Sequence, residues 1–234
     1  MSRIKSQLSE TKGRIDSACR VSGREPGTVS LVAVSKTFPA DDIREAVSAG
    51  QRIFGESRLQ EAEPKIDELP RDLEWHFIGR IQRNKVRKIL PLFPFIHAVD
   101  SLRLAEYMDG VALGLGLRPR VFLQVNQAGE ESKGGIGIGG LQTGFGEFMG
   151  LKNLDVVGLM AIPPPAEAEQ SRHWFRELRE LRDHLEGNFS THLPFLSMGM
   201  SGDFEVAIQE GATHVRVGSA IFGKRDYKVE GELG

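Results

Sequence analysis

Residues 29–37 read VSLVAVSKT, a short run of mostly β-branched and other apolar residues that stops at a serine and a lysine. A run of this length with polar boundaries is typical of a strand buried in a parallel sheet. With residues 29–35 as the first strand, seven further runs of the same kind follow along the chain. They cover residues 52–56, 74–79, 95–100, 120–126, 154–162, 194–199 and 214–220.

Longer amphipathic stretches separate these runs. Residues 41–49, 101–113 and 167–185 repeat apolar side chains every three or four positions, as one face of a helix does. The alternation of eight short strands with helices predicts an α/β fold, a single (β/α)8 TIM barrel. We expect an extra N-terminal helix over residues 2–21. Because no long linker interrupts residues 1–234, we expect one domain.

The overall composition excludes several classes of protein. Of the 234 residues, 40% are hydrophobic and 26% are charged, which is typical of a folded globular chain rather than a disordered one. The formal net charge is −2, so the chain lacks the excess of basic residues that is typical of nucleic-acid binders. No apolar run is long enough to span a membrane. The six histidines lack metal-ligand spacing, so no metal is expected. A single cysteine, Cys19, favours a reducing compartment, and we expect a cytoplasmic monomer.

Residues 129–150 are unusually rich in glycine, with nine glycines in 22 positions. Glycine costs about 1 kcal/mol per site in a helix, so the helix after the fifth strand is expected to be short or frayed. This segment is either a mobile lid over the barrel mouth or a surface segment without a role.

Candidate functional residues lie where the strands end, because a barrel of this type carries its chemistry at the C-terminal ends of its strands. Lys36 directly follows the first strand. A lysine partly shielded from water has a lowered pKa, because burial disfavours the ammonium form. Its free amine can then attack an aldehyde and form a Schiff base. The alternative is a solvated lysine that ends the strand.

The last two strands end in groups that suit an anion. Gly218 and Ser219 follow the eighth strand, where backbone N–H groups opening a short helix can cradle a phosphate. Ser201, after the seventh strand, offers a hydroxyl and is the expected N-cap of the next helix. Arg216 lies on the eighth strand and needs an acceptor, either a structural carboxylate or the ring nitrogen of a ligand. An amine for an aldehyde, a guanidinium for a ring nitrogen and N–H groups for a phosphate together describe pyridoxal 5′-phosphate (PLP).

The chain resembles the YggS/PROSC-type pyridoxal-phosphate homeostasis proteins, whose barrel is like that of alanine racemase. Matching motifs span nearly the whole chain. They include LVAVSKT at 31–37, FGES-x-x-QE at 54–61, WHFIG at 75–79, HAVDS at 97–101, GLMAIP at 158–163, LSMGMSGDFE at 196–205 and VRVGSAIFGKRDY at 215–227.

The resemblance implies a fold-type III PLP barrel and a role for each candidate residue. Lys36 would form the Schiff base with PLP, and Arg216 would hydrogen-bond the pyridine nitrogen. The phosphate would be held by Ser201, Gly218 and Ser219, and the loop at 130–133 would border the site. Members of the family are thought to buffer the cofactor or deliver it to PLP-dependent apo-enzymes, without firmly established turnover.

Three positions depart from the family pattern. Ser57 replaces the asparagine that follows FGE, and keeps only a hydroxyl for a contact near the cofactor. Arg80 replaces a histidine or proline, and Gly202 replaces an aspartate.

Two enzyme functions remain as alternatives to a PLP carrier. A racemase needs a second acid or base, and the two tyrosines, Tyr107 and Tyr227, are poorly placed for that role. An aldolase acting on sugar phosphates would use the lysine and the phosphate cradle but would not need Arg216.

Overall fold

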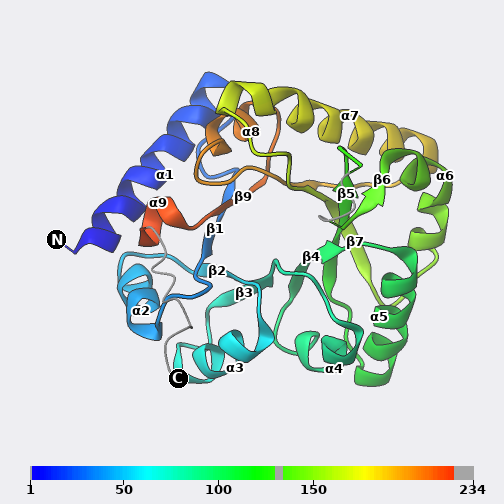
Figure 1. Cartoon of the computed structure of the whole chain (residues 1–234), viewed down its shortest axis with the longest axis horizontal. Helices are drawn as coiled ribbons and strands as arrows, with labels where there is room; N and C mark the ends of the chain where they lie inside the picture. Colours follow the sequence, from blue (N-terminus) through cyan, green and yellow to red (C-terminus); the bar gives the residue numbers. More distant parts are fainter. Residues whose placement is uncertain (1, 130–133, 224–234) are drawn as a thin grey trace, which may run out of the picture.

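The chain folds into a closed barrel of parallel strands surrounded by helices (Figure 1). The computed structural model describes residues 2–129 and 134–223. Within them the strand order is β4-β3-β2-β1-β9-β8-β7-β5, and β4 also pairs with β5, which closes the ring. The barrel strands are β1 (Ser30–Val34), β2 (Ile53–Glu56), β3 (Glu74–Phe77), β4 (Phe95–Val99), β5 (Arg120–Asn126), β7 (Asp155–Ala161), β8 (Phe195–Ser197) and β9 (His214–Val217). Each lies inside a range predicted from the sequence, so the barrel prediction is confirmed.

Helices occupy the outside of the ring (Figure 1). They are α1 (Arg3–Val21), α2 (Ala40–Ser48), α3 (Leu59–Glu68), α4 (Val86–Ile89), α5 (Leu102–Leu115), α6 (Ile138–Met149), α7 (Arg172–Phe189), α8 (Phe204–Gln209) and α9 (Ser219–Phe222), with 3-10 turns η1 (Arg83–Lys85) and η3 (Ala168–Ser171). A two-residue strand, β6 (Ile136–Gly137), pairs with β5 outside the barrel ring. No helix among residues 2–129 and 134–223 is long and apolar enough to cross a membrane.

Helix α1 is the expected extra helix, and it joins the two ends of the barrel sequence. It packs against α2 from the first βα unit and against α8 and α9 from the last two. The guanidinium of Arg14 pairs with Glu205 on α8 at 2.7 Å, and Arg3 Nη2 donates to the carbonyl of Phe222 on α9 at 2.9 Å. The helix therefore closes the outer ring where the first and last units meet.

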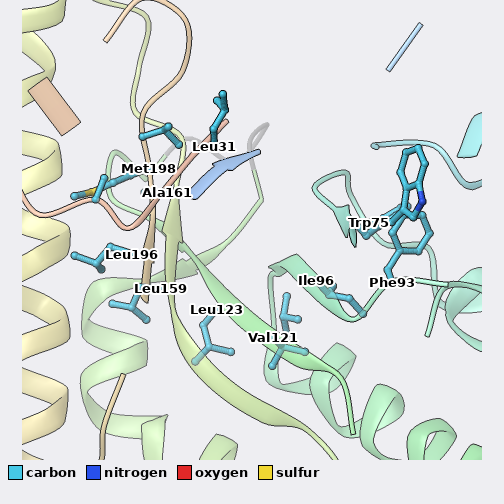
Figure 2. Close-up of a cluster of buried hydrophobic side chains, with 14 of the residues drawn as sticks. Leu31, Trp75, Phe93, Ile96, Val121, Leu123, Leu159, Ala161, Leu196 and Met198 are labelled. Atoms are coloured by element: carbon cyan, nitrogen blue, oxygen red, sulfur yellow. The ribbon is translucent and has the colours of Figure 1, made fainter. Parts of the chain in front are cut away.

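The strands separate two apolar layers, because successive side chains on a strand point to opposite faces. The outer layer, between strands and helices, includes one residue from each of five barrel strands: Leu31, Ile96, Leu123, Leu159 and Leu196 (Figure 2). The second, smaller cluster comprises Phe95, Ala98, Phe122, Val157 and Met160. Three buried histidines lie beside it, in ring contact with Phe95 and Phe122.

Residues 138–149 of the glycine-rich segment form a regular helix, so the expectation of a short or frayed one is wrong. Helix α6 runs for 12 residues and buries Leu141, Phe145 and Phe148, which share one face. The ring of Phe145 meets Phe189 of α7 edge-on at 5.1 Å. Burial of these side chains outweighs the low helix propensity of the glycines. Residues 130–133, named above as a border of the site, and Tyr227 lie outside the described residues.

Candidate functional site

One pocket at the C-terminal ends of the strands brings together five of the six candidate residues. It has a volume of about 270 Å³ and is lined by Val34, Lys36, Ile78, Ile162, Met200, Ser201, Gly202, Arg216, Gly218 and Ser219. Larger pockets of about 410 and 380 Å³ lie at the opposite ends of the strands, near the starts of β5 and β1. Because barrels of this type carry their chemistry at the C-terminal ends, the smaller pocket is the candidate site.

Arg216 is buried on β9 and is held by two acceptors. Its Nη1 donates to Ser197 Oγ at 2.6 Å, and its Nη2 donates to the carbonyl of Ala161 at 2.9 Å. Burial lowers the pKa of Arg216 to about 10, against the opposing effect of Asp203. The guanidinium is therefore a cation at neutral pH. Among residues 2–129 and 134–223, Ser197 and Ala161 accept from two of its five N–H groups, and the guanidinium lines the pocket.

Lys36 is half-buried directly after β1, in a turn that is held from several sides. The next residue, Thr37, adopts the left-handed conformation with φ 71°. This conformation is strained for a β-branched residue and persists only when its surroundings hold it. The Thr37 N–H donates to Glu61 Oε2 at 3.1 Å, and the Ser35 hydroxyl donates to Glu56 Oε1 at 2.7 Å. These contacts set the position of the Lys36 backbone at the pocket rim.

A buried ion pair lies beneath this turn. Lys65 Nζ on α3 donates to Glu56 Oε1 at 2.7 Å and to the carbonyl of Ser35 at 3.0 Å. Glu56 is fully buried at the end of β2, and its Oε2 has no hydrogen-bond partner among the described residues. Burial raises the pKa of Glu56, while Lys65 acts in the opposite direction. The pair connects α3 and β2 to the residue that precedes Lys36.

Glu56, Glu61 and Lys65 are functional neighbours that the sequence reasoning missed. Both carboxylates were visible in the motif FGES-x-x-QE, and Lys65 lies four residues after Glu61 on the same face of α3. What the sequence did not reveal was that the first strand ends against that face.

Ser201 lies beside the start of α9 and does not begin α8 as expected. Its hydroxyl oxygen accepts hydrogen bonds from the N–H groups of Gly218 at 3.3 Å and Ala220 at 3.4 Å. Asp203 takes the place before α8, and its Oδ1 accepts from the N–H of Met200 at 2.6 Å. Ser201, Gly218 and Ser219 therefore form one polar corner of the pocket, although they come from two loops.

Ser57 lies in a neighbouring pocket rather than in the one that Lys36 lines. That pocket has a volume of about 290 Å³, and Arg58, Arg80 and Lys85 also line it. The loops after β2 and β3 touch here: a Cβ added at Gly79 would be 2.2 Å from the carbonyl oxygen of Ser57. Two of the three departures from the family pattern, Ser57 and Arg80, thus share this second pocket, while Gly202 lines the first.

The polar residues of the barrel interior do not form a metal site. No group of three or more histidine, cysteine, aspartate or glutamate side chains with a suitable arrangement occurs in the part of the chain that the structure describes. His76 and His97 are fully buried and hydrogen-bonded to each other.

Comparison with known proteins identifies the class to which this barrel and pocket belong. The chain belongs to the family described as alanine racemase, N-terminal domain, which it matches over residues 15–226. Among its relatives are proteins named pyridoxal phosphate homeostasis protein. The one from Aquifex aeolicus is 45% identical and covers 94% of this chain and 98% of its own length. The one from Pseudomonas aeruginosa is 46% identical and covers 97% of this chain and 98% of its own length.

A solved structure of a relative superimposes on this chain. PipY from Synechococcus elongatus PCC7942, solved with PLP bound, is 39% identical and superimposes with a TM-score of 0.80. The match covers 90% of this chain and 100% of the PipY chain. The family resemblance seen in the sequence motifs is therefore confirmed.

Proposed function

We propose that this chain binds PLP in the pocket lined by Lys36 and Arg216 and acts in pyridoxal phosphate homeostasis. The observation that carries the proposal is the meeting of three different groups in one pocket of about 270 Å³. An amine, a guanidinium and a corner of hydroxyl and backbone N–H donors match the aldehyde, ring nitrogen and phosphate of the cofactor. PLP-bound PipY and the names of the curated relatives support the same reading.

Each residue has a separate task in the proposed site. Bound PLP supplies an aldehyde that condenses with an amine, and Lys36 provides that amine at the rim of the pocket. Gly218, Ser219 and Ser201 form the phosphate end of the site: the hydroxyls of Ser201 and Ser219 and the Ser219 N–H are its donors, and the Gly218 N–H, which donates to Ser201 Oγ at 3.3 Å, holds that serine in place. Arg216 donates a hydrogen bond to the ring nitrogen. Ser57, in the neighbouring pocket, acts on the loop geometry rather than by direct contact.

The protonation state of Arg216 favours storage over turnover. With a pKa of about 10, the guanidinium keeps its proton at neutral pH and donates a hydrogen bond without transferring the proton. A ring nitrogen left unprotonated is a weak acceptor of electrons from a carbanion. The described residues that line the pocket also include no histidine, tyrosine, cysteine, aspartate or glutamate that would act as a second acid or base. We therefore propose a carrier rather than a racemase.

The wider proposal is that the cofactor is buffered in the cytoplasm or passed to PLP-dependent apo-enzymes. The single cysteine, Cys19, supports a reducing compartment, and it is a fully buried residue of α1.

A titration of the purified protein with PLP tests the site. The wild-type protein and a Lys85→Ala control, whose lysine lies in the neighbouring pocket, are expected to develop the same visible absorption band. Lys36→Ala is expected to develop none. Equal bands in all three proteins would place the cofactor elsewhere.

A second assay separates the carrier from the racemase. The PLP-loaded protein is incubated with L-amino acids in deuterated water, followed by chiral chromatography. No racemisation above that of free PLP is expected. Racemisation and deuterium uptake that vanish in Lys36→Ala would establish an enzyme instead.

A further inference from the structure

A continuous row of buried hydrogen bonds crosses the barrel interior and ends on Arg216. Arg216 Nη1 is 2.6 Å from Ser197 Oγ, which in turn is 2.7 Å from His97 Nδ1. His97 Nε2 is 2.9 Å from His76 Nδ1, and His76 Nε2 is 2.9 Å from Glu74 Oε1. The row uses one side chain each from β9, β8 and β4 and two from β3.

The direction of every hydrogen in this row follows from its two ends. Arg216 can only donate, so Ser197 Oγ accepts from it. The single hydroxyl hydrogen of Ser197 is then donated to His97 Nδ1. His97 in consequence carries its hydrogen on Nε2 and donates it to His76 Nδ1. His76 likewise carries its hydrogen on Nε2 and donates it to the carboxylate of Glu74.

The electrostatics agree with two neutral imidazoles. Burial lowers the pKa of His97 well below its usual value, and burial lowers the pKa of His76 despite the raising effect of Glu74. The hydrogen bond to His76 lowers the pKa of Glu74, which keeps that acceptor ionised. Three other charged or titratable groups among the described residues act on the row: His214, whose Nδ1 lies 3.0 Å from the Thr213 hydroxyl, Arg120, which acts on Glu74, and Asp203, which acts on Arg216.

The two ends of the row lie at opposite ends of the barrel. Glu74 is the first residue of β3, and 39% of its side chain is exposed. His76, His97 and Ser197 are fully buried. Arg216, at the other end, lines the proposed cofactor pocket. The orientation of a hydroxyl beneath the pocket is thus set by a carboxylate on the far face.

We propose that Glu74, His76, His97 and Ser197 are positioning residues for Arg216. The row makes Ser197 Oγ an obligatory acceptor for one guanidinium nitrogen, so that Arg216 presents its remaining N–H groups to the ring nitrogen in a single orientation. This inference rests on the proposed function, because Arg216 acts on PLP only if the pocket binds it. In this proposal the four residues act on the cofactor through the guanidinium of Arg216.

The first test examines the row without any cofactor. Nitrogen-15 NMR of the imidazoles in the cofactor-free protein distinguishes the two neutral tautomers from the imidazolium. At neutral pH, His76 and His97 are expected to carry hydrogen on Nε2 only. Either ring found as the Nδ1–H tautomer or as imidazolium would overturn the proposal.

The second test measures PLP affinity from the visible absorption band. Ser197→Ala removes the acceptor and is expected to weaken binding about tenfold, the effect of one hydrogen bond to a charged group. The band itself should persist, because Lys36 is untouched, but its pH dependence should differ from that of the wild type. Ser197→Thr keeps the hydroxyl and is expected to restore most of the affinity. Ser197→Ala binding with unchanged affinity and an unchanged pH profile would contradict the proposal.

A third variant tests the far end of the row. Glu74→Gln removes the charge that fixes the direction of the hydrogen bonds and is expected to shift the His76 nitrogen resonances and to weaken PLP binding severalfold. Asp72→Asn is the matched control, because Asp72 is an exposed neighbour just before β3 that pairs with Arg52, and it should change neither. Identical behaviour of the two variants would show that Glu74 has no special role. Failure of the wild-type protein to bind PLP at all would refute the proposed function, while the NMR result would still decide whether the row exists.

Discussion

Removal of Lys65 provides a sharp test of how the Lys36 turn is held. In the Lys65→Met variant, the apolar stem is largely kept and the ammonium is lost. The fully buried carboxylate of Glu56 then loses the cation 2.7 Å from its Oε1, and the carbonyl of Ser35 loses a donor at 3.0 Å. Breaking a buried ion pair by removing one partner costs about 3–5 kcal/mol, because the remaining charge is left uncompensated.

The expected loss lies near the lower end of that range, at about 3 kcal/mol, because the Lys65 side chain is 11% exposed and water reaches its end of the pair. For a chain of this length, such a loss lowers the melting temperature by roughly 6–12 °C. The free energy of unfolding is measured by urea titration monitored by circular dichroism.

The pH dependence of the lost stability shows whether the loss comes from the charge of Glu56. Burial already places the pKa of Glu56 above its ordinary value of 4.5, and the loss of Lys65 raises it further. The folded protein then binds more protons than the unfolded chain between those two pKa values, so its stability falls as the pH rises through that window. The deficit of Lys65→Met is therefore full at neutral pH and shrinks as the pH falls toward 4.5.

A double-mutant cycle completes the test. Glu56→Gln removes the charge that Lys65 neutralises, so Lys65→Met combined with Glu56→Gln should cost clearly less than the sum of the two single changes. A loss below about 1 kcal/mol in Lys65→Met, or full additivity in the cycle, would refute the role assigned to the buried pair.

Three further predictions test the scaffold around the site. Gly79→Ala places a Cβ 2.2 Å from the carbonyl oxygen of Ser57 and should destabilise the protein by about 3 kcal/mol in urea titration, whereas Gly13→Ala, with nothing within 4 Å, should stabilise it slightly. Glu210, whose pKa is raised by burial but lowered overall by Arg176 and Arg172, stabilises the fold above its unfolded pKa and loses that effect as the pH falls. Glu210→Gln should therefore lower the free energy of unfolding by about 1–2 kcal/mol at pH 7, with a gap that closes in acid; a gap independent of pH would be contrary to this. Phe145→Ala should cost about 3–5 kcal/mol and reduce helix content, since this ring holds the glycine-rich α6 in place; an unchanged melting temperature would count against that explanation.

The barrel was predictable because its determinants are local. Each strand is a short apolar run with its own polar boundaries, and the helices repeat their apolar residues at regular spacing. Helix α6 was not predictable in the same way, because its glycines give a local preference against helix. Burial of Leu141, Phe145 and Phe148, with Phe145 packed against Phe189 of α7, reverses that preference.

The part of the candidate site that lies at the strand ends was predictable from the sequence. Lys36, Arg216 and Gly218 follow from the rule that the C-terminal ends of barrel strands meet around one mouth. The hydrogen-bond partners that hold these residues in place could not be predicted by this rule, because the partners are distant in the sequence. Ser197 and His97 are 100 residues apart, and the partners of Ser35 come from β2 and α3. Such pairs depend on the register between strands, which no single stretch of sequence contains.

The most direct test of the account is the covalent mapping of PLP. The purified protein is saturated with PLP and treated with borohydride, which makes the link between an amine and PLP permanent, and the labelled peptide is identified by mass spectrometry. We predict a single label on Lys36, with reduced labelling in Ser201→Ala because the phosphate corner is weakened. Label spread over other lysines, such as the half-buried Lys85 and the exposed Lys88, or no label on Lys36, would contradict the proposed site.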